Sequence, residues 1–240
     1  YYVRDQAPHI LLLGNVGAVN NYPPEVIRKA MEKIQADAMC MHLNPAQELA
    51  QPEGNVSFQV CLENIKKTAK ELPVVAKETG NGFNRENAIA LKKAGVKAID
   101  VGGHGGTSWV KVEKFRGGAN YAPVDWGIPT AASILECRVG LPLIATGGIR
   151  SGLDVGKAIA LGADAAGVAL PVLRWYYQNG KEYVKRQLEE WITELKTVMS
   201  LTNSSNIEEL KKADVVVSGP LFEWCQARSI DIERLANKTF

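Results

Sequence analysis

The sequence lacks the features that mark membrane, secreted and nucleic-acid-binding proteins. No apolar run reaches the roughly 18–20 residues that span a bilayer, and the opening string YYVRD has no apolar signal-peptide core. The 28 Lys and Arg residues barely exceed the 26 Asp and Glu residues, so the net charge is only +2. That balance implies neither a nucleic acid nor an anionic membrane as a partner. We expect an ordinary globular protein.

Cysteine is scarce and scattered. The four residues Cys40, Cys61, Cys137 and Cys225 form no C-x-x-C pair, which argues against a zinc site and against a disulfide framework. Free cysteine is usually buried, so we expect four reduced, buried thiols. This pattern favours a cytoplasmic location.

Short apolar runs alternate with helical patterns along the chain. The runs occupy residues 9–13, 38–41, 73–76, 98–101, 143–145 and 166–169. Each is apolar on both faces and none is joined to the next by a hairpin turn, which is typical of parallel strands in βαβ units. Between two of them, Asn84 is a candidate cap for a helix that Gly95 ends. The pattern predicts an α/β fold.

Polar residues follow the predicted strands. Asn15, His42, Lys77, His104 and Arg150 all come just after an apolar run. In a TIM (β/α)8-type barrel these positions share the C-terminal face, whereas an open doubly wound sheet would divide them around a switch point. Their shared position favours the barrel.

The number of strands is below that of a closed barrel. About six βα units are present where a barrel needs eight, and we expect the first two to be missing from the N-terminal side. Residues 1–180 would carry the barrel units and the ligand loops. Residues 181–240, which open with an amphipathic helix, would form a C-terminal helical extension of the same domain.

A glycine turn predicts a phosphate site. Gly147 and Gly148 follow an apolar run and precede Arg150 and a helix, and a second loop follows at residues 169–171. Glycines let backbone amides approach an anion, and a helix N-terminus favours negative charge. An ordinary tight turn with Arg150 on the surface is the alternative. The presence of both loops favours phosphate, because the last two strands of such barrels carry this site.

Two further segments suit a flavin. Lys77 ends an apolar strand and can stabilise negative charge at the N1–C2 carbonyl of a reduced ring; otherwise it is a surface lysine whose ammonium reaches solvent. Residues 102–109 contain four glycines, which allow close approach of a flat ring, and Thr107 can donate to a ring or ribityl atom. His104 alone is a weak signal for catalysis.

The segment HLNPAQELAQPEG at residues 42–54 gathers several functional groups in one loop. It offers the imidazole of His42, the amides of Asn44 and Gln47, and the carboxylate of Glu48. One carboxylate with water and substrate phosphates suits Mg²⁺. Capping and loop hydrogen bonds are the alternative, but the loop lies on the same predicted face as the phosphate site.

Together these residues resemble the type 2 isopentenyl-diphosphate isomerases. The string at residues 42–54 matches the signature of that family, and GGTSW (105–109), DWGIPTAAS (125–133) and GGIRSGLD (147–154) stand in the family's order. The resemblance covers essentially the whole chain. GGIRSG alone is less specific, because other FMN barrels share it.

The resemblance implies an enzyme that interconverts isopentenyl and dimethylallyl diphosphate over reduced FMN with Mg²⁺, using NADPH to reduce the flavin. His42, Gln47 and Glu113 would be catalytic, His42, Asn44 and Gln47 would line the substrate, and Glu48 would bind the metal. The residues expected to hold FMN are Asn15, Lys77, Thr107, Gly148, Ile149, Arg150, Ala169 and Leu170. A homo-oligomer, a tetramer or octamer, is implied as well.

Two departures from the family are visible. Its N-terminal part, with a basic substrate-phosphate segment and two strands, is expected to be missing, and Gly102 and His104 replace its more typical residues. An FMN-dependent 2-hydroxyacid oxidase is a rival, since it shares Lys77 and GGIRSG. That chemistry pairs a histidine with an arginine three residues on, where this chain has Thr107 after His104. A non-catalytic flavin- or phosphate-binding fragment is the remaining alternative.

Overall fold

Six parallel strands form one sheet in the computed structural model, which describes residues 3–54, 59–118 and 124–238. The strands pair in chain order, β1 to β6, with the register Leu13↔Ala38 opening the first pair. They are β1 Leu13–Gly17, β2 Ala38–Leu43, β3 Val74–Glu78, β4 Ala98–Asp100, β5 Leu143–Ala145 and β6 Ala165–Ala166. The predicted α/β fold with six strands is confirmed.

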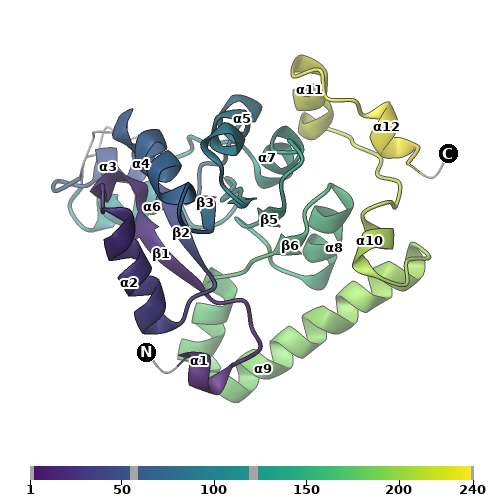
Figure 1. Ribbon diagram of the computed structural model, residues 1–240. Coiled ribbons are helices and arrows are strands. Elements are labelled where there is room, and N and C mark those ends of the chain that lie inside the picture. Colours follow the sequence, from purple (N-terminus) through teal and green to yellow (C-terminus); the bar gives the residue numbers. More distant parts are fainter. Residues whose placement is uncertain (1–2, 55–58, 119–123, 239–240) are drawn as a thin grey trace.

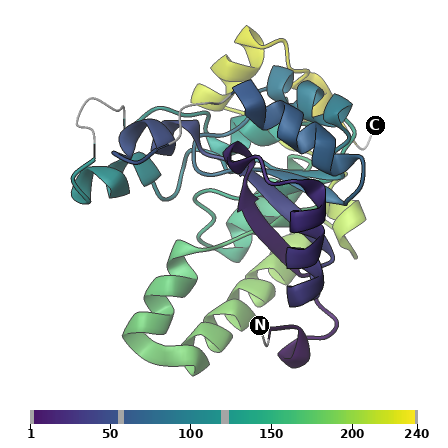
Figure 2. The same ribbon diagram turned by 60° about the vertical axis from the view of Figure 1, so that its left-hand side comes forward.

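Helices make every connection between neighbouring strands, as Figure 1 shows. The connecting helices are η1 Ala18–Asn20, α2 Pro24–Ile34, α3 Pro45–Ala50, α4 Gln59–Ala69, α5 Arg85–Ala94, α6 Trp109–Phe115, α7 Thr130–Glu136 and α8 Gly152–Ala160. The remaining helices are α1 Val3–Gln6, α9 Leu170–Leu201, α10 Ile207–Leu210, α11 Pro220–Ala227 and α12 Glu233–Ala236. In Figure 2, α3, α6 and the first part of α9 lie on the left-hand side of the molecule.

The two faces of the sheet have different neighbours. Met39, Val74 and Ile99 belong to the main core, which includes buried residues of the covering helices such as Ile27 and Leu91. The alternate residues form a separate inner cluster built on Ala38, Cys40 and Val75, with Leu13, Ala98 and Ile144 against it. Side chains alternate along a strand, so both faces of each strand are apolar because both are covered.

The inner face becomes polar at the carboxyl ends of the strands. Two positions beyond the inner apolar residues, the same face carries Asn15, His42, Lys77, Asp100 and Thr146. His42 is in register with Lys77, which is in register with Asp100. Because side chains alternate along each strand, these polar residues form a layer at one end of the sheet. Barrel enzymes place their active sites at this end.

Helix α9 has two parts. Gly180 interrupts it with non-helical angles, φ 76° and ψ −178°. The second part packs on α8 through Trp191, Leu195 and Val198, and Glu194 accepts from the Gly152 amide at 2.6 Å. The predicted amphipathic helix thus lies in the second part of α9. The division at residue 180 into barrel and extension stays a prediction.

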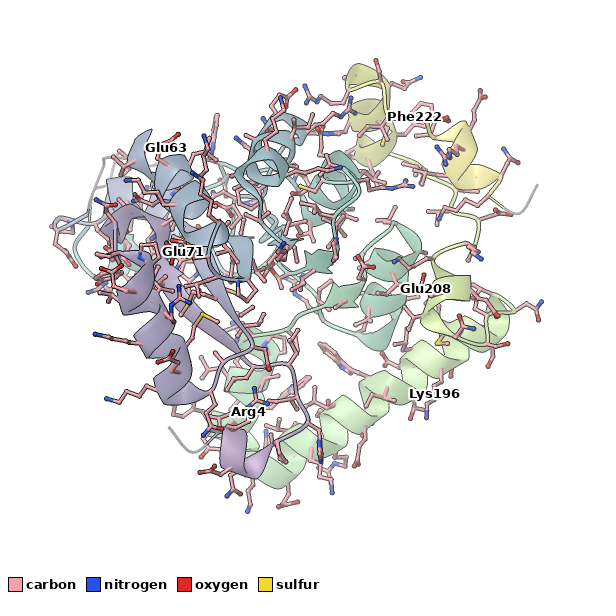
Figure 3. The ribbon with its side chains drawn as sticks, in the orientation of Figure 1. Arg4, Glu63, Glu71, Lys196, Glu208 and Phe222 are labelled. Carbon is pink, nitrogen blue, oxygen red and sulfur yellow. The ribbon has the colours of Figure 1, made fainter. Side chains whose placement is uncertain are left out.

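The C-terminal helices join the main core through Leu210, Cys225 and Leu235. On α7, buried Glu136 accepts from Arg228 Nε at 2.8 Å and from Trp224 Nε1 at 3.0 Å. Figure 3 labels Phe222 on the helix that brings this tryptophan. The tail is therefore held by an ionic contact with α7 as well as by apolar packing.

The N-terminal segment is held by Arg4, labelled in Figure 3. Its guanidinium donates to the carbonyl of Gln35 at 2.9 Å and pairs with Asp37 at 2.6 Å. Asp37 also accepts from the Leu12 amide at 2.7 Å, just before β1. The Leu12 hydrogen bond and Arg4 lower the pKa of Asp37 below its ordinary value.

All four cysteines are buried free thiols, as predicted. Burial raises their pKa values above the ordinary thiol range, that of Cys137 to about 12. Thiolates are therefore scarce at neutral pH. No helix within the described ranges has the length and apolar character to cross a membrane.

The predicted cap of α5 is confirmed. The Asn84 side chain accepts from the Asn87 amide at 2.8 Å, and Gly95 ends the helix in the left-handed conformation. We expect Asn84→Ala to lower the free energy of unfolding by about 1 kcal/mol, measured by urea denaturation. Asn84→Asp retains the acceptor and should stay close to wild type; equal losses in both variants would contradict a capping role.

Candidate functional site

A cavity of about 820 Å³ opens at the carboxyl ends of the strands. Its walls come from residues of β1, β2 and β3, including Asn15 in β1, and from the loops that follow β3 to β6, including Ala169 after β6. Pockets of about 300–1,000 Å³ are typical of small-molecule and cofactor sites. The cavity has room for a ligand with a tricyclic ring and a phosphate tail.

The structure brings the predicted site residues together here. The cavity is lined by all eight residues expected to hold FMN, namely Asn15, Lys77, Thr107, Gly148, Ile149, Arg150, Ala169 and Leu170. His42 and Gln47, from the predicted metal and substrate loop, line the same cavity. The phosphate turn and the loop at residues 42–54 therefore open onto a common rim. Their individual ligands stay predictions.

The glycine turn after β5 has the shape of an anion site. Gly147 and Gly148 have φ values of 104° and 78°, which favour glycine and let backbone amides point into the cavity. Helix α9 also starts at this wall, and no side chain caps its first amides. A phosphate would satisfy amides at such a terminus.

Arg150 connects two of the loops. Its guanidinium donates to the carbonyl of Gly148 at 2.9 Å and to that of Gly105 at 2.6 Å. The side chain lines the cavity although it is largely exposed. It is therefore a fixed positive charge at the predicted phosphate end, which differs from the free surface arginine of the alternative reading.

Lys77 takes part in a hydrogen-bonded chain that the sequence did not reveal. Its ammonium lies 2.7 Å from Asp100 Oδ2, and Thr146 Oγ1 donates to Asp100 Oδ1. The Gly102 amide donates to the same Oδ1 at 3.2 Å. The lysine is thus not reaching for solvent, because a buried carboxylate holds it in the wall of the cavity.

Glu78 organises the loop after β3. Only 3% of the residue is exposed, and its Oε2 accepts from the amides of Gly80 at 2.7 Å, Gly82 at 2.9 Å and Asn81. Burial raises the pKa of Glu78 to about 6, although these amide hydrogen bonds oppose the shift. The loop also lines the cavity.

We expect Glu78 to make stability fall between about pH 4.5 and pH 6. Its pKa is higher in the folded chain than the ordinary 4.5, so the folded state holds the proton more tightly and loses that advantage as pH rises. The shift corresponds to about 2 kcal/mol. Urea unfolding at several pH values should show the free energy of unfolding of the wild type falling by about 2 kcal/mol, relative to that of Glu78→Gln, between about pH 4.5 and pH 6. Parallel pH curves for the two proteins would contradict it.

The loop at residues 42–54 contacts α6 through a buried carboxylate. Gln47 Nε2 donates to Glu113 Oε1 at 2.9 Å, and Gln51 Nε2 donates to the same oxygen at 3.0 Å. Arg116 pairs with the other oxygen at 2.8 Å. The hydrogen bonds from Gln51 and Gln47 and the charge of Arg116 together hold the pKa of Glu113 below its ordinary value, against its burial. Glu113 is thus an ionised acceptor behind Gln47.

Asn44 lies beside the cavity and orders the loop. The residue is buried, and its Nδ2 donates to Glu48 Oε1 at 3.1 Å and to Gln47 Oε1 at 3.4 Å. Two of the predicted functional side chains are thereby fixed by a third. Its predicted contact with substrate stays a prediction.

His42 is set up as a neutral donor. Burial lowers its pKa, the charge of Lys77 lowers it further, and Glu48 opposes the shift. Asn15 Nδ2 lies 3.2 Å from His42 Nδ1, and an amide nitrogen only donates, so Nδ1 accepts and the proton sits on Nε2. A neutral imidazole can donate to a ligand oxygen without adding a charge.

Glu48 offers a single carboxylate to a divalent cation. Within the described ranges no three His, Cys, Asp or Glu side chains gather as a metal cluster. Glu48 is half-buried at the start of α3. Mg²⁺ commonly uses one or two carboxylates and completes its shell with water and phosphate oxygens.

Several lining residues had no sequence prediction. Glu78, Trp109, Arg174 and Trp175 line the cavity, and Asp100 lies behind it. Asp100 and Glu78 carried a usable signal, since each is a carboxylate at the end of an apolar strand. Arg174 carried none, because its place depends on where α9 starts and which way it runs.

Comparisons with known proteins agree with this geometry. Residues 19–217 match the family described as FMN-dependent dehydrogenase. The isopentenyl-diphosphate delta-isomerase of Methanosarcina mazei is 46% identical, with 98% of this chain and 67% of that protein covered. That of Methanocaldococcus jannaschii is 45% identical, with 94% and 67% covered. The chain spans about two thirds of the length of these relatives.

Solved structures support the fold. A mutant mandelate oxidase with a monooxide FMN adduct matches with a TM-score of 0.57 at 22% identity, covering 78% of this chain and 57% of that one. GMP reductase from Trypanosoma brucei matches with a TM-score of 0.58 at 22% identity, covering 83% and 45%. At such identities these matches concern the fold alone. By sequence, the chain belongs to the FMN-dependent dehydrogenase family and, within it, to the group of isopentenyl-diphosphate delta-isomerases.

Proposed function

We propose that this chain carries the active site of an isomerase that interconverts isopentenyl and dimethylallyl diphosphate over reduced FMN with Mg²⁺. The observation that carries the proposal is that the glycine turn with Arg150 and the Gln47–Glu113 pair share the rim of one cavity. A phosphate cradle alone would fit many flavoproteins. The amide–carboxylate pair at the same cavity adds groups that can orient an alkene and hold a proton.

The reaction moves a proton without net oxidation. Reduced FMN, when bound, supplies an electron-rich ring that stabilises a developing tertiary cation and an exchangeable proton. Lys77 would face the N1–C2 edge of the ring, and the turn at Gly148 would hold its phosphate. NADPH is the proposed source of reducing equivalents.

The chain's own groups would orient the substrate and handle the proton. Gln47 is too weak a base to act alone, but it donates to ionised Glu113 and can orient the alkene or pass a proton transiently. His42 presents its Nε2 proton to an oxygen of the substrate. Glu48 would bind Mg²⁺, which neutralises the diphosphate.

A 2-hydroxyacid oxidase is the competing enzyme. Such chemistry needs an arginine that clamps the substrate carboxylate. Thr107 occupies the expected place and lines the cavity, whereas Arg174 enters from α9. Oxygen consumption with lactate or glycolate would support a 2-hydroxyacid oxidase.

The proposal is tested with purified protein. Flavin absorbance after purification shows whether FMN is retained, and radiolabelled isopentenyl diphosphate with reduced FMN and Mg²⁺ shows whether it is isomerised. Turnover that requires both additions supports the proposal, and Glu48→Gln should raise the Mg²⁺ concentration needed. FMN binding without turnover would favour a non-catalytic flavin-binding chain. Light scattering tests the proposed tetramer or octamer.

A further inference from the structure

Asp100 is a buried carboxylate to which the proposed reaction assigns no role. Only 6% of the residue is exposed, and it sits at the end of β4 in register with Lys77 on β3. One oxygen faces the ammonium of Lys77 at 2.7 Å. Lys77 and Thr146 line the cavity in front of it.

The other oxygen of Asp100 is fixed from behind. Thr146 Oγ1 and the Gly102 amide both donate to Oδ1, so the carboxylate cannot turn without losing hydrogen bonds. Its Oδ2 is therefore held toward Lys77. Lys77 lies on β3, Asp100 lies on β4 and Thr146 directly follows β5, so the sheet itself sets the direction of the lysine side chain.

We propose that Asp100 is a positioning residue for the flavin: through Lys77 it sets how much more tightly the protein binds reduced FMN than oxidised FMN. A fixed ammonium favours the additional negative charge of the reduced ring. Without the carboxylate, the lysine loses the hydrogen-bonded partner that holds its ammonium in the wall of the cavity. The inference rests on the flavin site of the proposed function and not on the isomerisation.

Asp100→Asn is the informative substitution. With the carboxamide oxygen kept toward Thr146 and Gly102, the amide nitrogen faces Lys77, and two donors then oppose each other. The ammonium then has to leave its place. Lys77→Met removes the ammonium altogether, so the pair of variants separates an effect through Lys77 from any other effect of Asp100.

The measurement is the ratio of the dissociation constants of the apoprotein for oxidised and for dithionite-reduced FMN, titrated without oxygen. We expect Asp100→Asn to lower this ratio about tenfold, toward that of Lys77→Met, equivalent to about 30 mV for two electrons. In the Lys77→Met background the same substitution should change nothing further. An unchanged or raised ratio, or an equal fall in both backgrounds, would overturn the inference.

Thr146→Val is the second variant, in case Asp100→Asn does not fold. It keeps the charge of Asp100 but removes one donor to Oδ1, so the ratio should fall about threefold, in line with the loss of one hydrogen bond. An unchanged ratio would contradict the inference. If wild-type protein binds neither form of FMN, the flavin site itself is wrong, which is a different failure.

Discussion

Gly148→Ala is expected to weaken FMN binding by at least about 100-fold, or ~2.7 kcal/mol. Gly148 has φ 78°, and a Cβ there would lie 2.6 Å from the carbonyl carbon of Gly105. The loops after β4 and β5 touch at this point, where Gly103 also donates to the Thr146 carbonyl at 2.8 Å. A methyl group would push them apart and turn the amides away from the phosphate.

The matched control for this variant is Gly95→Ala. Gly95 also has a positive φ of 93°, but its nearest neighbour would be Ala69 Cβ at 3.8 Å, and it lies at the C-terminus of α5. It should lose about 1 kcal/mol of stability from backbone strain and keep its FMN affinity. FMN fluorescence titration and urea unfolding of both variants make the comparison. Equal FMN affinity in the two variants would contradict a role of the glycine turn in binding the FMN phosphate.

Gln47→Ala should reduce kcat for the isomerisation by about 100-fold or more, the usual effect of losing a positioned proton-transfer group. Gln47 lines the cavity and donates to buried Glu113 at 2.9 Å. Its removal breaks the hydrogen bond that links this carboxylate to a residue of the cavity wall. The affinity for FMN should remain within a few-fold of wild type.

Gln51→Ala is the control for Gln47→Ala. Gln51 donates to the same oxygen of Glu113 at 3.0 Å but does not line the cavity. Its loss should disturb Glu113 without removing a group from the reaction, so kcat should fall much less. Full turnover in Gln47→Ala, or equal losses in the two variants, would show that Gln47 acts only as packing.

The sheet could be predicted from sequence because its strands are short, apolar and separated by helical patterns. Which residue faces inward could not be predicted, since strands covered on both faces have no polar alternation. Lys77 is inward and Ala76 outward only because of the register with β2 and β4. The sequence placed Asn15, His42 and Lys77 at the strand ends, but only the structure shows that they share the inner face with Asp100 and Thr146.

The candidate site also contains some features that the sequence predicted and others that it did not. Local motifs predicted the glycine turn at Gly147 and Gly148 and the loop at residues 42–54, because each lies within one segment. The Lys77–Asp100 pair joins residues 23 apart on neighbouring strands, and the Gln47–Glu113 pair joins residues 66 apart. Spacing does not encode such contacts. Glu113 was found through the family resemblance, and Asp100 was missed.

The most direct test of the proposed chemistry follows isopentenyl diphosphate by proton NMR in D₂O, with the FMN-loaded, reduced protein and Mg²⁺. We expect dimethylallyl diphosphate to appear with deuterium at the carbons that change protonation, while the flavin remains reduced. Unchanged isopentenyl diphosphate beside bound, reduced FMN, together with oxygen consumption on lactate or glycolate, would contradict the isomerase and point to hydroxyacid oxidation instead.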